Sequence, residues 1–508
     1  MRRSSKASGK MEGSKRQKMS AIGCPLIVLV VFLAQLPLAS AQDPPKSTDA
    51  AASSRAQSAA QRASLDRERA LSCSIADGFT LAAVGDLVLA VPHATAADPG
   101  FQSTVQILRS ADITFGNLEE NLIDISHFRG SPQAEHGGWW LIGVPEVAMD
   151  LRKMGFSMIS RANNHATDWG VEGMRETDQL LDAAGIVHAG TGEVRSSARA
   201  ARFLSTPKGR VGLISLASTF TPMSTSMQPL GEAPGRPGLN ALRTRRSMIM
   251  THEMLENLRK IRDAQPKGSL PPATDSPNEV DLFGVHYREG DKPGFTYEMN
   301  PVDLREILQS IREGKENSDF VIATVHAHEP GNWSEDPADF LPTLAHAAID
   351  AGADEFIGHG PHRLRGIEIY KGRPILYSLG DFFLQPAMQT PTAQDMYEEM
   401  NKNPSEVTDY ELAEGLAAHL FFDDNVWYES VIAVSRFENG QLSEIRLYPI
   451  DLRRLLRAPD RGIPQLAAPA EARTILERLQ RLSAPYLTAI EIVDNIGVIH
   501  VSGSQSPN

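Results

Sequence analysis

Two histidines lie three residues apart in a turn built from glycine and proline, GHGPH at residues 358–362. Imidazole nitrogens bind transition metals, and they also move protons near neutral pH. The turn therefore has three candidate roles: a metal site, a proton-transfer site, or a solvated turn whose histidines do no chemistry. The other polar clusters of the chain help to decide between them.

Four further polar clusters each follow an apolar run with the composition of a β-strand. They are residues 85–86 (GD), 116–119 (GNLE), 163–165 (NNH) and 326–328 (HAH). In open α/β sheets the loops at the carboxyl ends of the strands converge on the ligand. Five such clusters favour one shared metal centre over five unrelated turns. The candidate ligands are Asp86, Asn117, Glu119, Asn164, His326, His359 and His362.

The donor types of these side chains indicate which ions the centre would take. Carboxylate oxygens, an amide oxygen and imidazole nitrogens together suit manganese, iron or zinc better than calcium, which prefers oxygen alone. Seven candidate ligands exceed the four that a tetrahedral site needs. The sequence therefore predicts one or two divalent metal ions.

Each candidate also has a purely structural interpretation. Asp86 after a glycine fits a turn or a helix cap, and residues 163–164 fit a turn. His326 beside strand residues fits a core histidine with a satisfied ring. Only the coincidence of all five clusters favours metal binding over these separate explanations.

His165 and Asp168 are the predicted catalytic pair. If Asn164 holds a metal, the next side chain points across at the substrate, where a ring can donate a proton to a leaving group. Asp168 would fix the tautomer of that ring. In the alternative, His165 is a ligand or a buried ring and Asp168 caps the following helix.

Trp139, Trp140 and His328 are the predicted substrate-binding residues. The two indoles could stack on a sugar or a base, or pack into the core as part of a loop. His328 is the last residue of the HAH cluster, and it is expected beside the metal ligands rather than among them.

Alternating strand and helix patterns predict an α/β layered fold. The expected organisation is an export segment at 1–41, a linker at 42–76 rich in Ala, Ser, Gln and Arg, and a main domain at 77–385. A loop-rich insertion is expected at about 221–300. The C-terminal extension, 386–508, is expected to add strands and a helix to the same domain.

The N-terminus indicates export, to the periplasm or cell envelope. Seven basic residues precede an apolar run that ends in the small-x-small sequence at residues 39–41. The segment is either a signal cleaved after Ala41 or an uncleaved membrane anchor. The formal net charge of -13 argues against nucleic acid as a partner, although a metal could still attract an anionic substrate.

The stretches AVGDLVL, ADITFGNLEENL, GFSMISRANNHATDWGVEG and GADEFIGHGPHRLRGIEIYKGRPILYSLGDFF resemble the bacterial capsule-synthesis family called CapA, the poly-gamma-glutamate biosynthesis proteins. The resemblance covers about residues 79–383. It implies a variant of the calcineurin-type metallophosphoesterase fold, a four-layer α/β/β/α β-sandwich flanked by helices, with a two-metal centre.

The resemblance also implies roles for individual residues. Asp86, Asn164, His326, His359 and His362 match metal ligands, Asn117 or Glu119 stands in for the bridging carboxylate, and His165 matches the catalytic histidine. The chain departs from the wider pattern at four points that bear on the site. GNLE lacks the usual bridging aspartate, Val88 replaces a histidine ligand, Ala327-His328 stands where many members have Trp-Gly, and Asp381 replaces a common asparagine.

Three functions follow from this constellation. The first is a metal-dependent hydrolase, phosphoesterase-like, in capsule or polyglutamate metabolism. The second is a non-enzymatic subunit of a membrane capsule-synthesis complex that binds an anionic polymer such as polyglutamate. The third is a gamma-glutamyl hydrolase. The residues alone do not separate them, because all three need the same centre.

Overall fold

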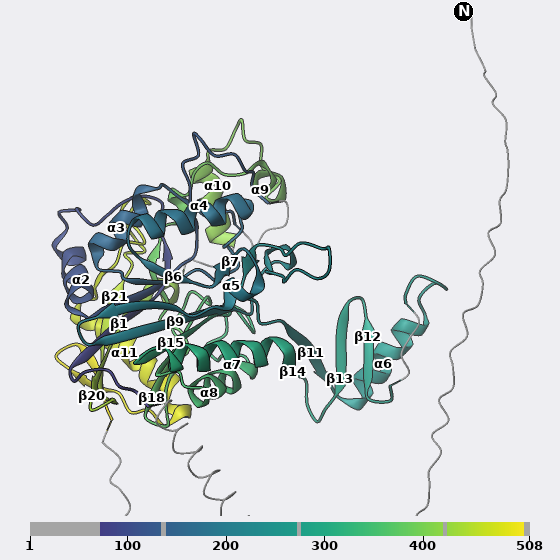
Figure 1. Ribbon diagram of the computed structural model, residues 1–508. Helices are drawn as coiled ribbons and strands as arrows, with labels where there is room; N and C mark the ends of the chain where they lie inside the picture. Colours follow the sequence, from purple (N-terminus) through teal and green to yellow (C-terminus); the bar gives the residue numbers. More distant parts are fainter. Residues whose placement is uncertain (1–71, 134–138, 272–275, 420–423, 502–508) are drawn as a thin grey trace, which may run out of the picture. The chain divides into compact units, whose positions relative to one another are not determined.

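The computed structural model describes residues 72–133, 139–271, 276–419 and 424–501 (Figure 1). The predicted export segment at 1–41 and all of the predicted linker before residue 72 lie outside these residues, so both remain predictions. Among the described residues, no helix combines the length and the apolar character that crossing a bilayer requires.

The first sheet contains ten strands built around β1 (Phe79–Val88). Parallel strands β2 (Ile113–Leu118), β5 (Met158–Ser160) and β6 (Val187–Ala189) continue from one edge of β1. The other edge of β1 pairs antiparallel with β20 (Glu429–Glu438) along its first half and parallel with β19 (Asp381–Leu384) along its end. The end of β1 is therefore enclosed between two parallel neighbours.

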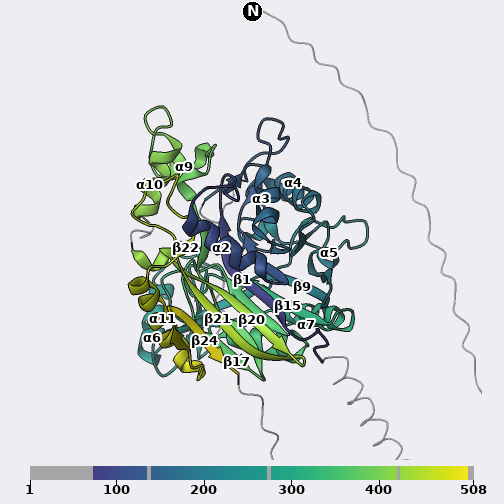
Figure 2. The ribbon, with the colours of Figure 1, turned by 90° about the vertical axis from the view of Figure 1, so that its left-hand side faces the viewer.

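The C-terminal part of the chain extends this sheet. β21 (Gln441–Asp451) follows β20, and β22 (Gln465–Leu466), β24 (Ile496–His500) and β23 (Glu491–Val493) complete it. Figure 2 shows β20, β21 and β24 in the same sheet as β1, with α11 (Pro469–Ser483) nearby. Residues after 429 thus share a sheet with residues near the start of the domain.

The second sheet has six strands in the order β17-β18-β16-β15-β9-β8. Its central strands β9 (Gly209–Ala217), β15 (Phe320–His326), β16 (Glu355–His359) and β18 (Arg373–Leu376) run parallel. The edge strands β8 (Arg202–Thr206) and β17 (Ile367–Tyr370) are antiparallel. The parallel direction brings the carboxyl ends of β15 and β16 to one edge.

Alternating side chains along the strands define four layers. Leu81 and Ala83 of β1 join one cluster with Ile322 and Ile357 of the second sheet, so this core lies between the sheets. Ala82 and Val84 point the other way, into a cluster that α2 (Pro99–Ser110) and α3 (Glu146–Met154) cover. On the outer face of the second sheet, α7 (Pro301–Glu316) and α8 (Phe340–Asp350) bury a third cluster. The predicted four-layer α/β/β/α sandwich is confirmed.

Local sequence signals start the covering helices. Asn300 caps α7 by accepting hydrogen bonds from the backbone N–H groups of Val302 and Asp303, and Pro301 occupies the first turn. Asp98 and Pro99 play the same parts at α2. These caps set where each helix begins over its sheet.

The segment expected to be loop-rich, 221–300, contains a small sheet of its own. Its strands are β11 (Thr244–Met250), β12 (Glu279–Leu282), β13 (Val285–Glu289) and β14 (Gly294–Met299), and α6 (His252–Asp263) packs on it. Among its described residues, Leu255, Val280 and Leu282 form the buried cluster. So small a core leaves a weak apolar pattern, which is why the sequence suggested loops there.

Candidate metal centre

Asp86 is fully buried near the end of β1, where β2 and β19 flank this strand. The register pairs it with Asn117 on one side and Asp381 on the other. Gly85 makes the approach possible, because a Cβ there would stand 1.7 Å from the carbonyl oxygen of Gly380. Asn117 Nδ2 donates to Asp86 Oδ1 at 2.8 Å.

The second sheet supplies two imidazoles opposite Asp86. His326 and His359 are register partners at the ends of β15 and β16, and their Nδ1 atoms are 3.0 Å apart. Asp86 Oδ1 lies 3.5 Å from Nδ1 of His359 and 3.9 Å from Nδ1 of His326. The candidate centre is therefore shared between the two sheets.

The GHGPH turn carries its second histidine into the same place. Gly360 has φ 114° and His362 has φ 54°, both in the left-handed region, and the Gly360 N–H donates to Asp86 Oδ2 at 2.9 Å. His362 Nδ1 lies 2.9 Å from Asp381 Oδ1, 3.8 Å from Glu119 Oε2 and 3.9 Å from Asp86 Oδ2. The turn thus places both of its histidines at one carboxylate cluster.

Glu119, the residue after β2 of the first sheet, lies close to two histidines at the end of β15 in the second sheet. Its Oε1 lies 3.3 Å from Nε2 of His326 and 3.8 Å from Nε2 of His328. His328 was predicted as a substrate-binding residue, yet its Nε2 is 2.8 Å from Nε2 of His326. His328 therefore stands among the candidate ligands.

These residues fit a divalent metal ion. Both carboxyl oxygens of Glu119 and Oδ2 of Asp381 are buried with no hydrogen-bond partner in the described part of the chain, an arrangement that is costly unless a cation is bound. Nitrogen and oxygen donors lie within coordination reach of one another in three overlapping groups. The groups are Asp86-His326-His359, Glu119-His328-His362 and Asp86-His362-Asp381.

Burial opposes charge on most of these groups. It raises the pKa of Asp86 to about 7 and the pKa of Glu119 well above its usual range, and neighbouring carboxylates add to both effects. Burial also lowers the pKa of His359 to about 3 and the pKa values of His326 and His328 well below the usual histidine value. Neutral imidazoles are the form that binds metals.

His362 behaves in the opposite way. Burial alone would lower its pKa, but the carboxylates of Glu119 and Asp381 outweigh that effect and raise the pKa to about 10. The acidic cluster therefore attracts positive charge, which is the property that a cation site requires.

The predicted catalytic pair lies in the turn after β5. Nδ1 of His165 is 2.6 Å from Oδ2 of Asp168, and the same oxygen accepts a hydrogen bond from the N–H of Leu141 at 2.8 Å. With Asp168 accepting from Nδ1–H, the Nε2 atom of His165 is left to act on a substrate. The structure thus brings these two residues together in the geometry of an oriented proton donor.

Asn163 connects this turn to the centre, whereas the sequence analysis had predicted its neighbour Asn164 as a ligand. Its side chain donates to Asn117 Oδ1 at 3.1 Å and accepts from the N–H of His165 at 3.2 Å. Asn117 thus uses its amide on Asp86 and Asn163, and its Nδ2 also lies 3.4 Å from Nδ1 of His326. Both Asn117 and Glu119 of GNLE therefore face the imidazoles, and the role of Asn117 as a ligand remains a prediction. Asn164 lies buried in the same turn, and its role as a ligand remains a prediction.

Trp139 and Trp140 do not line the centre with open ring faces. They are only 8% and 1% exposed, and they pack in a cluster with Trp169, Met396 and Tyr397. Helices α9 (Gln394–Glu399) and α10 (Asp409–His419) contribute to this cluster. This packing favours the alternative, a loop packed into the core, and a role of the two indoles in substrate binding remains a prediction.

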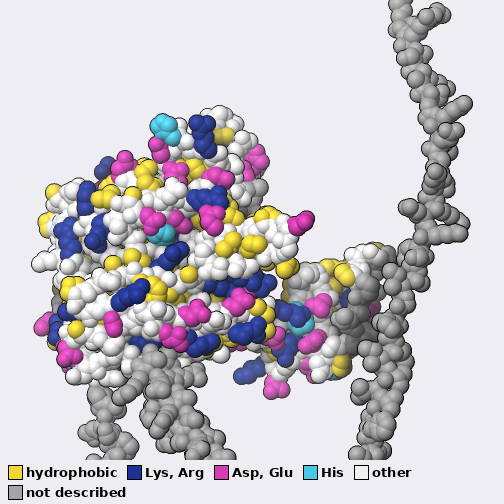
Figure 3. All heavy atoms as spheres, viewed as in Figure 1, with side chains coloured by type: hydrophobic (Ala, Val, Ile, Leu, Met, Phe, Trp, Pro, Cys, Tyr) yellow, Lys and Arg dark blue, Asp and Glu magenta, His cyan; other side chains and the backbone are white. Residues whose placement is uncertain are grey.

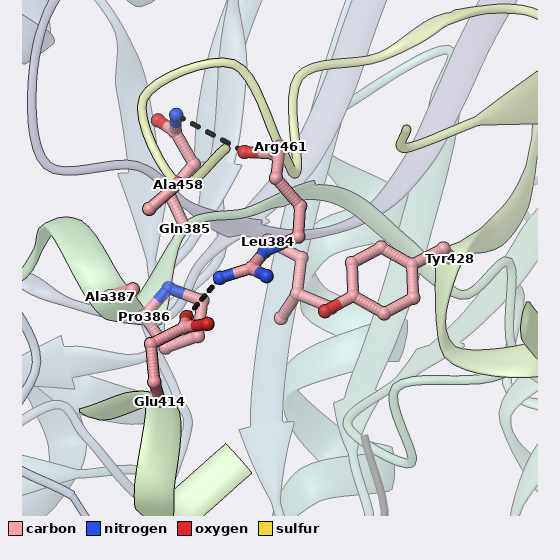
Figure 4. Close-up of a pocket in the computed structure, with 8 residues that line it drawn as sticks. All are labelled: Leu384, Gln385, Pro386, Ala387, Glu414, Tyr428, Ala458 and Arg461. Carbon is pink, nitrogen blue, oxygen red and sulfur yellow. Dashed lines mark hydrogen bonds and ion pairs between the residues drawn. The ribbon is translucent and has the colours of Figure 1, made fainter. Parts of the chain in front are cut away.

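A small cavity lies beside the residues that follow β19. It measures about 10 Å³ and lies among Leu384, Gln385, Tyr428 and Arg461 (Figure 4). Arg461 pairs there with Glu414. Room for a single water at most excludes this cavity as a substrate site.

The fold is a four-layer α/β sandwich, and buried carboxyl groups and imidazoles from the strand ends of both sheets meet in one candidate metal centre. The sequence model of the family described as bacterial capsule synthesis protein PGA_cap matches residues 80–386, and the chain belongs to this family. The predicted family membership is confirmed.

Several relatives are similar to this chain. The uncharacterized protein y4sH of Sinorhizobium fredii is 52% identical over 84% of this chain and 94% of its own length. The PGA biosynthesis protein CapA of Bacillus subtilis is 26% identical, over 60% of this chain and 63% of its own. A phosphatase structure from Mycoplasma pneumoniae covers 79% of this chain and 98% of its own, at 10% identity and a TM-score of 0.31, a likeness too remote to bear on function.

Proposed function

We propose that this chain is a metal-dependent hydrolase of capsule or poly-gamma-glutamate metabolism. One observation carries the proposal: among the described residues, buried carboxyl oxygens of Glu119 and Asp381 have no hydrogen-bond partner and lie among four histidines, beside an oriented His165–Asp168 pair. Perturbed titrating groups and an acid–base pair in one place are typical of catalytic sites. The relatives named for capsule and PGA biosynthesis support the polymer context.

The chain's own residues have distinct parts in the proposed reaction. Asp86, Glu119, Asp381 and the four histidines at 326, 328, 359 and 362 would hold one or two ions of manganese, iron or zinc. Such an ion, when bound, polarises the scissile group and offsets its developing negative charge. His165 donates a proton from Nε2 to the leaving atom, while Asp168 keeps the ring in the required tautomer.

A panel of substrates tests this proposal. Purified protein loaded with Mn²⁺ or Zn²⁺ is expected to hydrolyse at least one of a phosphomonoester, a phosphodiester and a gamma-glutamyl oligomer, and EDTA should abolish the activity. Cleavage of the gamma-glutamyl oligomer alone would identify a gamma-glutamyl hydrolase. Metal-loaded protein that leaves the whole panel intact would contradict the hydrolase proposal.

A binding subunit for polymer assembly is the second candidate. It is favoured by the name of a 27% identical relative from Mycobacterium tuberculosis, a probable polyglutamine synthesis accessory protein, which covers 43% of this chain. In that role the centre would hold an anionic polymer for a membrane complex without cleaving it. Binding of polyglutamate without turnover in the panel would support this role.

We also propose that the protein is exported to the periplasm or cell envelope. The basic start, the apolar run and the small-x-small ending before Gln42 support this. Mature protein from cells is expected to begin at Gln42 and to fractionate as soluble, which N-terminal sequencing measures. An intact 21–38 segment in washed membranes would show an anchor instead.

A further inference from the structure

Trp333 is an exposed indole beside the candidate metal centre. It lies between β15 and α8, and the residue is 78% exposed. The other four tryptophans of the chain are at most 8% exposed. A large apolar side chain left open to solvent next to a buried site is a candidate contact for a ligand.

The loop that carries Trp333 is held firmly. Nη1 of Arg363 donates to the carbonyl oxygen of Trp333 at 2.9 Å. Arg365, which is fully buried, reaches the carbonyl oxygens of Gly331 and Ser334 at 3.4 Å each. The indole also lies over Gly331, where an added Cβ would stand 2.4 Å from the ring. The ring is thus fixed on one side and open on the other.

Two hydrogen bonds connect this loop to residues at or next to the candidate metal centre. Asn332, next to Trp333, places Oδ1 2.7 Å from Nδ1 of His328. Arg363, which binds the Trp333 carbonyl, directly follows His362. A group that covers the indole would therefore lie at the rim of the centre.

Arginines stand on the same rim. Arg363, Arg478 and Arg481 lie 3.3 Å, 3.6 Å and 2.6 Å from carboxyl oxygens of Glu335. The side chain of Arg481, on α11, is 57% exposed. A guanidinium has five N–H donors, so one shared carboxylate leaves donors of the exposed Arg481 available to a second anion.

We propose that Trp333 and Arg481 form a substrate-binding rim for an acidic, peptide-like chain. Methylene groups of that chain lie on the indole, and a carboxylate of the same chain pairs with Arg481. Glu335, which pairs with Arg481, lies two residues after Trp333. The alternation of apolar and carboxylate groups along a polyglutamate matches an indole and a guanidinium held by the same loop. The inference rests on the proposed function for the polymer class, and it adds the residues that select it.

Tryptophan fluorescence gives a direct test, because acrylamide reaches Trp333 far more readily than the four buried rings. A gamma-linked glutamate decamer is expected to protect the accessible fluorescence of the Mn²⁺-loaded protein, and a glutamine decamer is expected not to. By calorimetry, Trp333→Ala and Arg481→Gln should each weaken decamer binding by about tenfold. Leu487→Ala, at a residue 94% exposed, is the control and should bind as the wild type does.

Equal decamer affinity in wild type, Trp333→Ala and Arg481→Gln would overturn the proposal that Trp333 and Arg481 bind the substrate. Equal protection by the glutamine decamer or by a sugar phosphate would overturn the ligand class. These outcomes are separable from the hydrolase proposal, because binding is measured without turnover. Protection and tenfold weakening in a protein that cleaves nothing would support the rim while the hydrolase proposal fails.

Discussion

Replacing His165 with asparagine is expected to lower turnover by about two to four powers of ten, with bound metal unchanged. The ring nitrogen facing Asp168 would be lost together with the proton that Nε2 donates. Since the candidate metal groups do not include His165, the metal content should stay at the wild-type level. Steady-state kinetics on the substrate found in the panel, with elemental analysis of the same sample, measures both quantities.

The chain offers a matched control for this variant. His127 pairs with Asp124 at 2.7 Å, also three residues apart, but its side chain is 84% exposed. His127→Asn should therefore keep full turnover. A His165→Asn protein that loses metal along with activity would make His165 a ligand, and one with wild-type turnover would remove it from the mechanism.

His359→Ala is expected to lower the amount of bound metal substantially. The variant removes one imidazole from the Asp86-His326-His359 group and leaves a carboxylate and one imidazole there. Losing a partner behind a ligand already costs about 10–100-fold in metal affinity, so losing a ligand should cost more. Elemental analysis after gel filtration measures the loss, and circular dichroism checks that the fold is kept.

His346→Ala is the control for this second variant. His346 lies on α8, pairs with Glu368 at 2.7 Å and stacks on Tyr370, so it shares no contact with the candidate centre in the described residues. Its metal content should equal that of the wild type. The same metal content in His359→Ala and His346→Ala would rule out the proposed centre.

Much of the candidate centre could be predicted because each candidate ligand lies at or just after the end of a strand. Asp86, His326 and His359 follow apolar runs whose direction and burial the sequence pattern indicates, and the parallel register then brings them together. Glu119 and His362 follow from the same logic, one residue after β2 and one turn after β16. The layered fold was predictable for the same reason, since alternating strands and helices constrain the sheets strongly.

Other features depend on pairings that are distant along the chain. Asp381 was noticed as a departure from the family pattern, yet only the pairing of β19 with β1 shows that it faces His362. His328 looked peripheral because its contact with Glu119 joins the two sheets. Trp139 and Trp140 pack against helices some 250 residues later, and no local pattern indicates such a partner.

The sharing of the candidate centre between two sheets has a consequence for folding. Asp86 lies near the start of the domain and Asp381 near the end of the segment that matches the family, yet their strands are neighbours. A centre assembled from such distant segments forms late, after long loops have closed. A chain still emerging from the ribosome, or one truncated before β19, lacks part of the donor set. The ion of the proposed centre is therefore expected to bind in the compartment where the protein completes folding, so the metal supply of that compartment would determine which ion is bound.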